Sequence, residues 1–290
     1  MKKAIVVCGP TTSGKSALAD GLAGLLTDRL EYWVTTVCVD SMQVYREIPV
    51  ISNQSRERPA ELIAVTSVAE NWNVARHAKA AEKILKHDEN ALFMLDAGTG
   101  MYLNAILMDL ELAPRVSPEL RNRAREMVEE AEYLEINPRR AVREIELDLA
   151  DAPRRGSIWD GRLRFDVNIV YLRPPKEVLA DAIERRTRRI LDMGVEEVAK
   201  LRESSQKGFE VTYQVRSAIG FQEINQALDG SSSLHEAGER ISQRTRTLAK
   251  RQIQWFDKLA DKLSTQAEVR VIHEPVSNNI KNYMRDIVGA

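Results

Sequence analysis

The chain contains few of the residues that mark secreted, metal-binding or membrane proteins. Its 290 residues include two cysteines and four histidines, and aromatic residues make up 6%. Cys8 and Cys38 both lie within apolar runs, which favours buried core thiols over a disulfide or half of a metal site. The histidines show no metal-ligand spacing, so we do not expect a zinc or iron site held by the protein alone. No apolar stretch reaches the roughly 18 residues that a membrane span needs.

The charges are almost balanced as well. The 42 basic and 43 acidic side chains leave a net charge of −1, so a nucleic-acid surface could come only from local clustering of basic residues. The first residues, MKKAIVV, run on without a signal-peptide cleavage site. We therefore expect a cytoplasmic protein with no membrane partner, and we expect a monomer. The length predicts one large domain or a core with a smaller lobe.

What the sequence does contain is a glycine-rich loop between a predicted strand, residues 3–8, and a predicted helix, residues 16–26. The loop fits the pattern G-x-x-x-x-G-K-[ST]. Its backbone N–H groups can cradle a polyphosphate, Lys15 adds a positive charge, and the Ser16 hydroxyl is placed to ligate Mg²⁺. A plain turn from strand to helix is the alternative. We predict a diphosphate or triphosphate site made by Gly9, Pro10, Thr11, Thr12, Ser13, Gly14, Lys15 and Ser16.

Apolar segments after this loop predict a parallel sheet. Residues 35–39, 91–95 and 166–172 read as further buried strands. They alternate with helical segments, which is typical of an α/β fold in which helices cover the sheet.

A charged segment with helical spacing, residues 113–158, interrupts this alternation. We predict that it is a helical insertion between a first part of the core, 1–112, and the rest of the core with its C-terminal helices, 159–290. The helices expected in the last part are 176–193, 195–204, 214–228 and 234–263.

Two further segments lie at strand ends, where the ligands of parallel sheets gather. Asp40 directly follows the strand at 35–39 and could hold Mg²⁺, take a proton from a nucleophile or cap the next turn. Thr99, in the turn Gly98-Thr99-Gly100, offers a hydroxyl that suits a second phosphate contact, or equally a helix cap. We expect both segments to meet the glycine-rich loop at one edge of the sheet.

The last long helix carries a basic stripe made of Arg240, Arg244 and Arg251. Such a stripe could grip the phosphates of a nucleic acid or a leaving pyrophosphate, or it could be a solvated face, and the spacing alone does not choose. The insertion is also rich in arginine, and we expect it to face the same acceptor. Its arginines are Arg121, Arg123, Arg125, Arg139, Arg140 and Arg143.

Six segments, in this order, closely resemble the tRNA dimethylallyltransferase family, whose relatives include the adenylate isopentenyltransferases. They are GPTTSGKS, VDSMQVYR, AGTGMYLNAIL, RRILDMGVEEVAKL, SAIGFQEI and RTRTLAKRQIQWF. The resemblance covers residues 3–110 and about 160–260, and its last segment is the most specific one.

The resemblance implies transfer of a dimethylallyl group from dimethylallyl diphosphate to the N6 amine of the adenosine next to a tRNA anticodon, with Mg²⁺ as cofactor. It implies that Asp40 is the general base and that Thr99 and Lys15 act on the diphosphate. Ser16 would hold Mg²⁺ together with the diphosphate. Arg216 would be a further diphosphate contact. The acceptor-binding residues that it implies are Ser41, Gln43, Tyr45, Arg244 and Arg251.

The departures from the family pattern fall on the acceptor side and on one diphosphate contact. Residues 47–54 and 60–64 differ from the usual segments, and Ser217 stands where the family has an arginine, with Arg216 one place earlier. The insertion is shorter than usual, which would also fit transfer to a free adenine nucleotide. A P-loop small-molecule kinase is a second alternative, because Leu92–Asp96 resembles a Walker B strand. A binding module gated by a nucleotide is the non-enzymatic alternative, although no segment marks a partner surface.

Overall fold

The computed structural model describes residues 2–30, 33–87, 91–114, 116–130, 138–153 and 157–274. The chain forms two compact units. The core unit comprises Met1–Met108 and Leu163–Ala290, and the small unit comprises Asp109–Arg162. The predicted insertion, 113–158, lies within the small unit.

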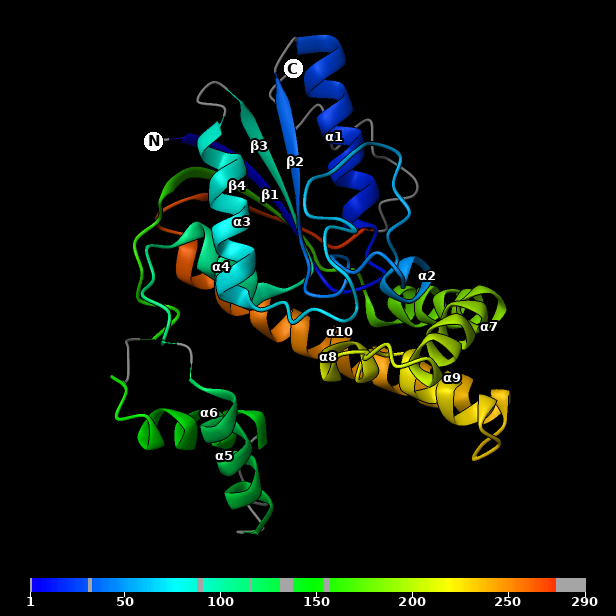
Figure 1. Ribbon diagram of the computed structural model, residues 1–290. Helices are drawn as coiled ribbons and strands as arrows, with labels where there is room; N and C mark the ends of the chain where they lie inside the picture. Colours follow the sequence, from blue (N-terminus) through cyan, green and yellow to red (C-terminus); the bar gives the residue numbers. More distant parts are fainter. Residues whose placement is uncertain are drawn as a thin grey trace. The chain divides into compact units, whose positions relative to one another are not determined.

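In the described part of the core unit, five strands form one parallel sheet with the order β2-β3-β1-β4-β5 (Figure 1). The strands are β1 Lys2–Cys8, β2 Val34–Val39, β3 Leu92–Ala97, β4 Phe165–Leu172 and β5 Glu268–Ile272. The predicted α/β class with a parallel sheet is confirmed. β5 is a strand that the sequence pattern does not predict, because Ile272 alone of its residues is buried and it lacks the apolar run of the other four.

The strands end at a common level, which creates the edge on which the site is built. Cys8 is in register with Ala97 on one side and with Tyr171 on the other, and Val39 also pairs with Ala97. The loops that follow β1, β2 and β3 therefore start side by side.

Helices cover both faces of the sheet. Those of the core unit are α1 Lys15–Leu30, α2 Pro49–Ser52, α3 Val74–His87, α4 Gly100–Leu107, α7 Lys176–Gln206, α8 Tyr213–Arg216, α9 Phe221–Leu228 and α10 Leu234–Leu263. Leu18, Leu22 and Leu26 of α1 pack into one buried cluster with Val7 of β1 and Met94 of β3. Figure 1 shows α3 and α4 on the side of the sheet away from α1. α10 packs on the same face as α3 and α4, and its Phe256 ring lies 5.9 Å from the ring of Tyr171 in β4.

Two expected helix boundaries are wrong. The sequence predicts a break at Gly194, but α7 runs through it, and Gly194 packs against Ile51 of α2 inside the helix. The helix expected over 214–228 is instead two helices, α8 and α9. The chain turns between them at Gly220, whose φ of +102° suits glycine.

The described residues of the small unit form the helices α5 Pro118–Glu130 and α6 Pro138–Leu149. Glu146, with a side chain only 3% exposed, accepts hydrogen bonds from Arg121 at 2.6 Å and Arg143 at 2.8 Å. Burial would raise the pKa of Glu146, but these bonds bring the pKa below its ordinary value. Two of the insertion's arginines thus stabilise the unit itself. The side chains of Arg139 and Arg140 lie outside the described residues.

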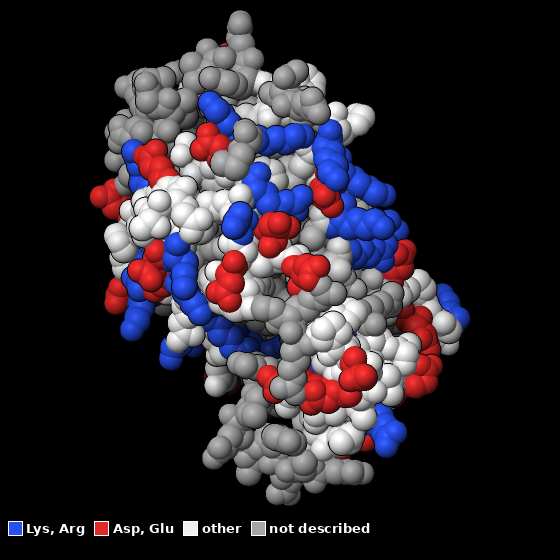
Figure 2. All heavy atoms as spheres, turned by 90° about the vertical axis from the view of Figure 1, so that its left-hand side faces the viewer, with Lys and Arg blue, Asp and Glu red and all other residues white. Residues whose placement is uncertain are grey.

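Figure 2 shows the charged side chains on one face of the molecule. On the face seen in Figure 2, Lys and Arg side chains are interleaved with Asp and Glu side chains. Among the helices that the structure describes, none is long and apolar enough to cross a membrane. On the face in Figure 2, a nucleic acid would meet local groups of basic residues rather than a uniformly basic surface.

Candidate active site

The glycine-rich loop joins β1 to α1 and needs unusual backbone angles. Thr12 and Gly14 have φ values of 65° and 86°, in the left-handed region. A Cβ atom on Gly9 would lie 2.6 Å from the carbonyl oxygen of Leu172, so only glycine fits between the loop and β4. The sequence places these glycines where the backbone must turn tightly, and backbone N–H groups in a turn of this kind can form an anion-binding concavity.

Asp40 and Lys15 both approach Gly98, although the three residues lie in separate parts of the chain: after β2, at the start of α1 and after β3. A Cβ atom on Gly98 would lie 2.7 Å from Asp40 Oδ2 and 3.5 Å from Lys15 Nζ. Gly98 is buried, and its N–H donates to the carbonyl oxygen of Val39. The missing side chain at Gly98 is therefore what lets the carboxylate and the ammonium group approach the same point.

The two oxygens of Asp40 have different surroundings. Oδ1 accepts the backbone N–H groups of Met42 at 2.8 Å and Gln43 at 3.3 Å, which is the turn-capping role considered above. Oδ2 is the oxygen beside Gly98 and Lys15. One oxygen thus fixes the carboxylate while the other stays available for chemistry, and the two interpretations of Asp40 are compatible.

Thr99 connects the Asp40 loop to the turn after β3. Its Oγ1 accepts the backbone N–H of Ser41 at 3.1 Å and lies 3.5 Å from the Ser41 hydroxyl. It stands at the N-cap position of α4 but makes no side-chain capping bond there. The structure thus brings Ser41 and Thr99 together with Asp40 at the edge of the sheet.

Gln43 and Tyr45 lie in the interior behind this edge. Gln43 is 5% exposed, and its Oε1 accepts a hydrogen bond from Cys38 Sγ at 3.4 Å. Burial raises the pKa of the Cys38 thiol well above its ordinary value, so the thiol stays protonated. Tyr45 is fully buried, and its hydroxyl donates to Gln214 of α8 at 2.9 Å. Their acceptor-binding roles stay predictions, and the structure also gives Tyr45 a packing role.

With this geometry in place, comparison with known proteins is informative. The family model described as IPP transferase matches residues 43–259. The chain belongs to the IPP transferase family. A tRNA dimethylallyltransferase of Rubrobacter xylanophilus is 46% identical over 291 residues, which cover 99% of each chain. The resemblance seen in the six sequence segments is thereby confirmed.

Solved structures of the family have the same fold. The full-length tRNA isopentenylpyrophosphate transferase of Bacillus halodurans is 25% identical in sequence. Its superposition has a TM-score of 0.69 and covers 100% of this chain and 96% of that one. A eukaryotic dimethylallyltransferase acting on tRNA is 21% identical, with a TM-score of 0.73 over 99% of this chain and 78% of that one, and it is similar in fold alone.

The sequence interpretation assigns a diphosphate contact to Arg216, and the structure brings a different arginine to the glycine-rich loop. Arg216, the predicted substitute, is exposed at the end of α8. Arg186 of α7 instead donates a hydrogen bond to Thr11 Oγ1 in the loop and another to the carbonyl oxygen of Ile51. Burial of its guanidinium lowers the pKa of Arg186, and Asp40 acts in the opposite direction. Sequence reasoning missed Arg186 because four arginines lie within 185–189 and helix packing selects one of them.

Gln252 of α10 is a second residue that the sequence interpretation missed. Its Oε1 accepts the backbone N–H of Thr11 at 2.7 Å, and its Nε2 donates to the carbonyl oxygen of Gly98 at 2.8 Å. This side chain therefore connects the phosphate loop to the Gly98 turn. Gln252 lies in the sequence segment RTRTLAKRQIQWF, the most specific part of the family resemblance, but the sequence interpretation assigned it no role.

The three arginines of the predicted stripe on α10 have different surroundings in the structure. Arg244 donates to Glu223 of α9, which is 4% exposed, and to the carbonyl oxygen of Ser217. Arg240 donates to the Ser232 hydroxyl, whereas Arg251 is exposed. The structure thus gives Arg244 a packing role, while acceptor binding by Arg244 and Arg251 stays a prediction.

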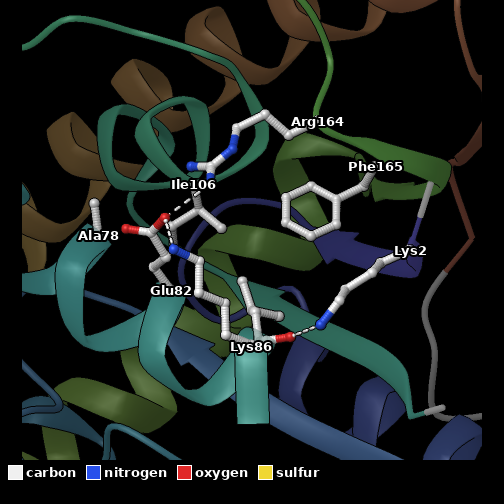
Figure 3. A pocket seen from close by; sticks show the side chains of 8 residues that line it. Lys2, Ala78, Glu82, Lys86, Ile106, Arg164 and Phe165 are labelled. Atoms are coloured by element: carbon white, nitrogen blue, oxygen red, sulfur yellow. Dashed lines mark hydrogen bonds and ion pairs between the residues drawn. The ribbon is translucent and has the colours of Figure 1, made fainter. Parts of the chain in front are cut away.

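A pocket of about 230 Å³ lies at the other ends of the strands (Figure 3). It is lined by Lys2 and Phe165, the first residues of β1 and β4, and by side chains of α3 and α4. Glu82 in its wall pairs with Lys86 at 3.0 Å and Arg164 at 3.2 Å. This pocket is separate from the phosphate loop, which follows the opposite end of β1.

Proposed function

We propose that the protein transfers a dimethylallyl group from dimethylallyl diphosphate to the N6 amine of an adenine in tRNA. The observation that carries this proposal is the approach of Asp40 Oδ2 and Lys15 Nζ to Gly98 beside a phosphate-binding loop. A base for the incoming amine and a cation for the leaving diphosphate thus lie next to each other. Membership of the family, with a tRNA dimethylallyltransferase 46% identical, supports this reaction.

The leaving diphosphate requires neutralisation of the charge that develops as the allylic bond breaks. The loop N–H groups, Lys15 and Arg186 are the donors that we assign to it, with Thr99 steadying the same group. Arg186 takes the place that the sequence interpretation gave to Arg216, because it is the arginine in contact with Thr11.

Mg²⁺ fits the residues at the start of α1. Ser16 Oγ donates its hydrogen to Asp96 Oδ2 at 2.7 Å, so both lone pairs of the hydroxyl oxygen remain free for a cation that prefers oxygen ligands. When bound there with the diphosphate, Mg²⁺ would supply Lewis-acid stabilisation of the leaving group. No cluster of three or more His, Cys, Asp or Glu side chains that could hold a metal occurs among the described residues, so substrate oxygens would complete the ligand set.

The acceptor amine requires a base because an aromatic amine is a weak nucleophile. Asp40 Oδ2 is the proton acceptor that we assign, since Oδ1 is already engaged by two backbone N–H groups. Because the hydrogen bonds to Oδ1 fix the carboxylate, Oδ2 can take up a proton without a change in the orientation of the side chain. The amine attacks the allylic carbon, the bond to the diphosphate oxygen breaks, and the amine proton passes to Asp40.

Transfer to a free adenine nucleotide and small-molecule kinase activity are not favoured by the family relationship. The test is incubation of the protein with labelled dimethylallyl diphosphate and Mg²⁺, with unmodified tRNA in one reaction and AMP in another. We expect label in tRNA and little in AMP. ATP turnover without prenyl transfer would overturn the proposal, and efficient labelling of AMP alone would overturn the choice of acceptor.

A further inference from the structure

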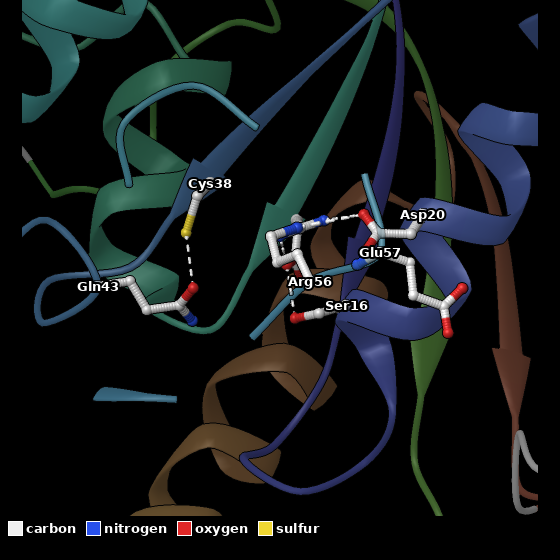
Figure 4. Close-up of polar contacts among 7 residues, drawn as sticks. Ser16, Asp20, Cys38, Gln43, Arg56 and Glu57 are labelled. Carbon is white, nitrogen blue, oxygen red and sulfur yellow. Dashed lines mark hydrogen bonds and ion pairs between the residues drawn. The ribbon is translucent and has the colours of Figure 1, made fainter. Parts of the chain in front are cut away.

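One arginine of the segment 47–64, Arg56, is buried close to the start of α1, where the glycine-rich loop ends. Arg56 is 5% exposed and lies between two buried carboxylates, of which Figure 4 labels Asp20. It donates to Asp20 Oδ1 of α1 at 2.5 Å and to Asp96 Oδ2 of β3 at 2.6 Å. The side chains of Asp20 and Asp96 are 2% and 1% exposed. The three side chains form what we call the Arg56 triad.

The two carboxylates of the triad are not equally satisfied. Asp20 Oδ1 accepts from Arg56, and its Oδ2 accepts the backbone N–H of Glu57 at 3.0 Å. Asp96 Oδ1 is buried and has no hydrogen-bond partner. Two carboxylates face one guanidinium, so one negative charge stays uncompensated, and such a charge is costly in the interior unless a cation reaches it.

The unsatisfied carboxylate adjoins the hydroxyl that the family resemblance assigns to Mg²⁺. Ser16 Oγ donates to Asp96 Oδ2 at 2.7 Å, on the same oxygen that receives Arg56. Arg56 therefore holds Asp96 in place, and Asp96 in turn fixes the direction of the Ser16 hydroxyl. Phosphate-loop enzymes of other kinds use a carboxylate at the end of a neighbouring strand together with the loop Ser or Thr to hold Mg²⁺.

We propose that Asp96, anchored by the Arg56 triad, is a positioning residue for Mg²⁺ and makes diphosphate binding depend on the metal. This rests on the proposed function only in requiring a diphosphate at the loop. Without Mg²⁺, the excess negative charge disfavours an anion nearby. With Mg²⁺, the charge is compensated and the Ser16 oxygen presents its lone pairs to the ion.

The test measures binding of pyrophosphate to the full chain by calorimetry, over a range of Mg²⁺ concentrations, without any prenyl transfer. Asp96→Asn should raise the Mg²⁺ concentration for half-maximal binding by about tenfold to a hundredfold, as other residues around a metal's direct ligands do. Pyrophosphate binding without Mg²⁺ should be unchanged or tighter. Asp20→Asn is the matched control. It removes the other carboxylate that Arg56 binds and leaves Asp96, the carboxylate that accepts from Ser16, in place.

Equal Mg²⁺ dependence in wild type and Asp96→Asn, or equal shifts in the Asp96→Asn and Asp20→Asn variants, would overturn the role of Asp96. If Asp96→Asn does not fold, Asp96→Ser keeps a hydrogen-bond acceptor without the charge, and the same shift is expected. Failure of the wild type to bind pyrophosphate even with Mg²⁺ would overturn the proposed function instead. The two failures are therefore distinguishable.

Discussion

The phosphate loop uses eight consecutive residues, 9–16, whereas the segment that follows Asp40 depends on partners far along the chain. Tyr45 is held by Gln214, 169 positions away, and the predicted acceptor residue Arg244 is held by Glu223 of α9. The donor side of the site is thus a local structure between one strand and one helix. The acceptor side is assembled by tertiary packing, so its residues carry folding roles as well as any binding role.

This difference matters for how substitutions should behave. On the donor side, a change should alter binding or rate and leave stability nearly intact. On the acceptor side, the same kind of change should also alter the free energy of unfolding, because buried partners such as Glu223 lose their hydrogen bonds.

The largest effect is expected at the point where the two sides meet. Asp40→Asn should lower the rate of prenyl transfer by about two to four powers of ten, because the amide can still accept at Oδ1 but cannot take a proton. Pyrophosphate binding in the presence of Mg²⁺ should not change. Single-turnover kinetics and calorimetry measure the two quantities. A variant nearly as fast as wild type would leave Asp40 with the turn-capping role alone.

The acceptor side should respond to acid. Trp72 Nε1 donates to His77 Nδ1 at 3.1 Å, and the Trp72 backbone N–H donates to Gln214, the partner of Tyr45. Burial lowers the pKa of His77 to about 4, below its ordinary value of 6.5. The unfolded chain therefore binds a proton first as the pH falls, and stability should drop by about 3 kcal/mol between pH 6.5 and pH 4.

Urea unfolding at several pH values measures this loss. His77→Asn should reduce the dependence in this range, since its amide oxygen can accept from Trp72 without titrating. An unchanged pH profile in that variant would assign the acid sensitivity to other groups.

The third prediction concerns Gly98. Gly98→Ala should slow prenyl transfer by about a hundredfold, because the new methyl group would lie 2.7 Å from Asp40 Oδ2 and must displace it. Gly24→Ala is the control, since a Cβ there would meet only the flexible Arg58 side chain at 3.2 Å. Equal rates in the two variants would show that Asp40 and Lys15 need not approach Gly98.

The fourth prediction separates two arginines. Arg186→Ala should weaken binding of pyrophosphate with Mg²⁺ by about tenfold to a hundredfold, as expected for a charged hydrogen-bond donor. Arg216→Ala, on the exposed end of α8, should change it little. Calorimetry on both variants decides the matter. The reverse order would restore the assignment made from sequence.

The smallest effect is expected on α10. If exposed Arg251 contacts a tRNA phosphate, Arg251→Gln should reduce the slope of log binding constant against log salt concentration by about 1, and it should leave stability unchanged. Arg244→Gln should instead lower the free energy of unfolding, since it leaves Glu223 without its partner. Filter binding at several salt concentrations and urea unfolding measure the two responses. The comparison fails if both variants change only the salt slope.

The parts of the protein whose geometry is local could be predicted from the sequence. A strand, a glycine-rich loop and a helix start predict the strand–loop–helix unit from a few consecutive residues, and alternating strands and helices predict the parallel sheet. Asp40 and Gly98 could be placed at one edge because parallel strands end together.

The side chains from distant helices that reach this edge could not be predicted from the sequence, because helix packing selects them. Arg186 rather than Arg216 contacts the loop because of how α7 packs, and Gln252 connects the loop to the Gly98 turn because α10 lies against it. Arg56 is buried between Asp20 and Asp96 although its segment is irregular. The physical reason is range: periodicity and loop motifs describe neighbours in the chain, whereas these contacts depend on packing between elements that the sequence pattern does not relate.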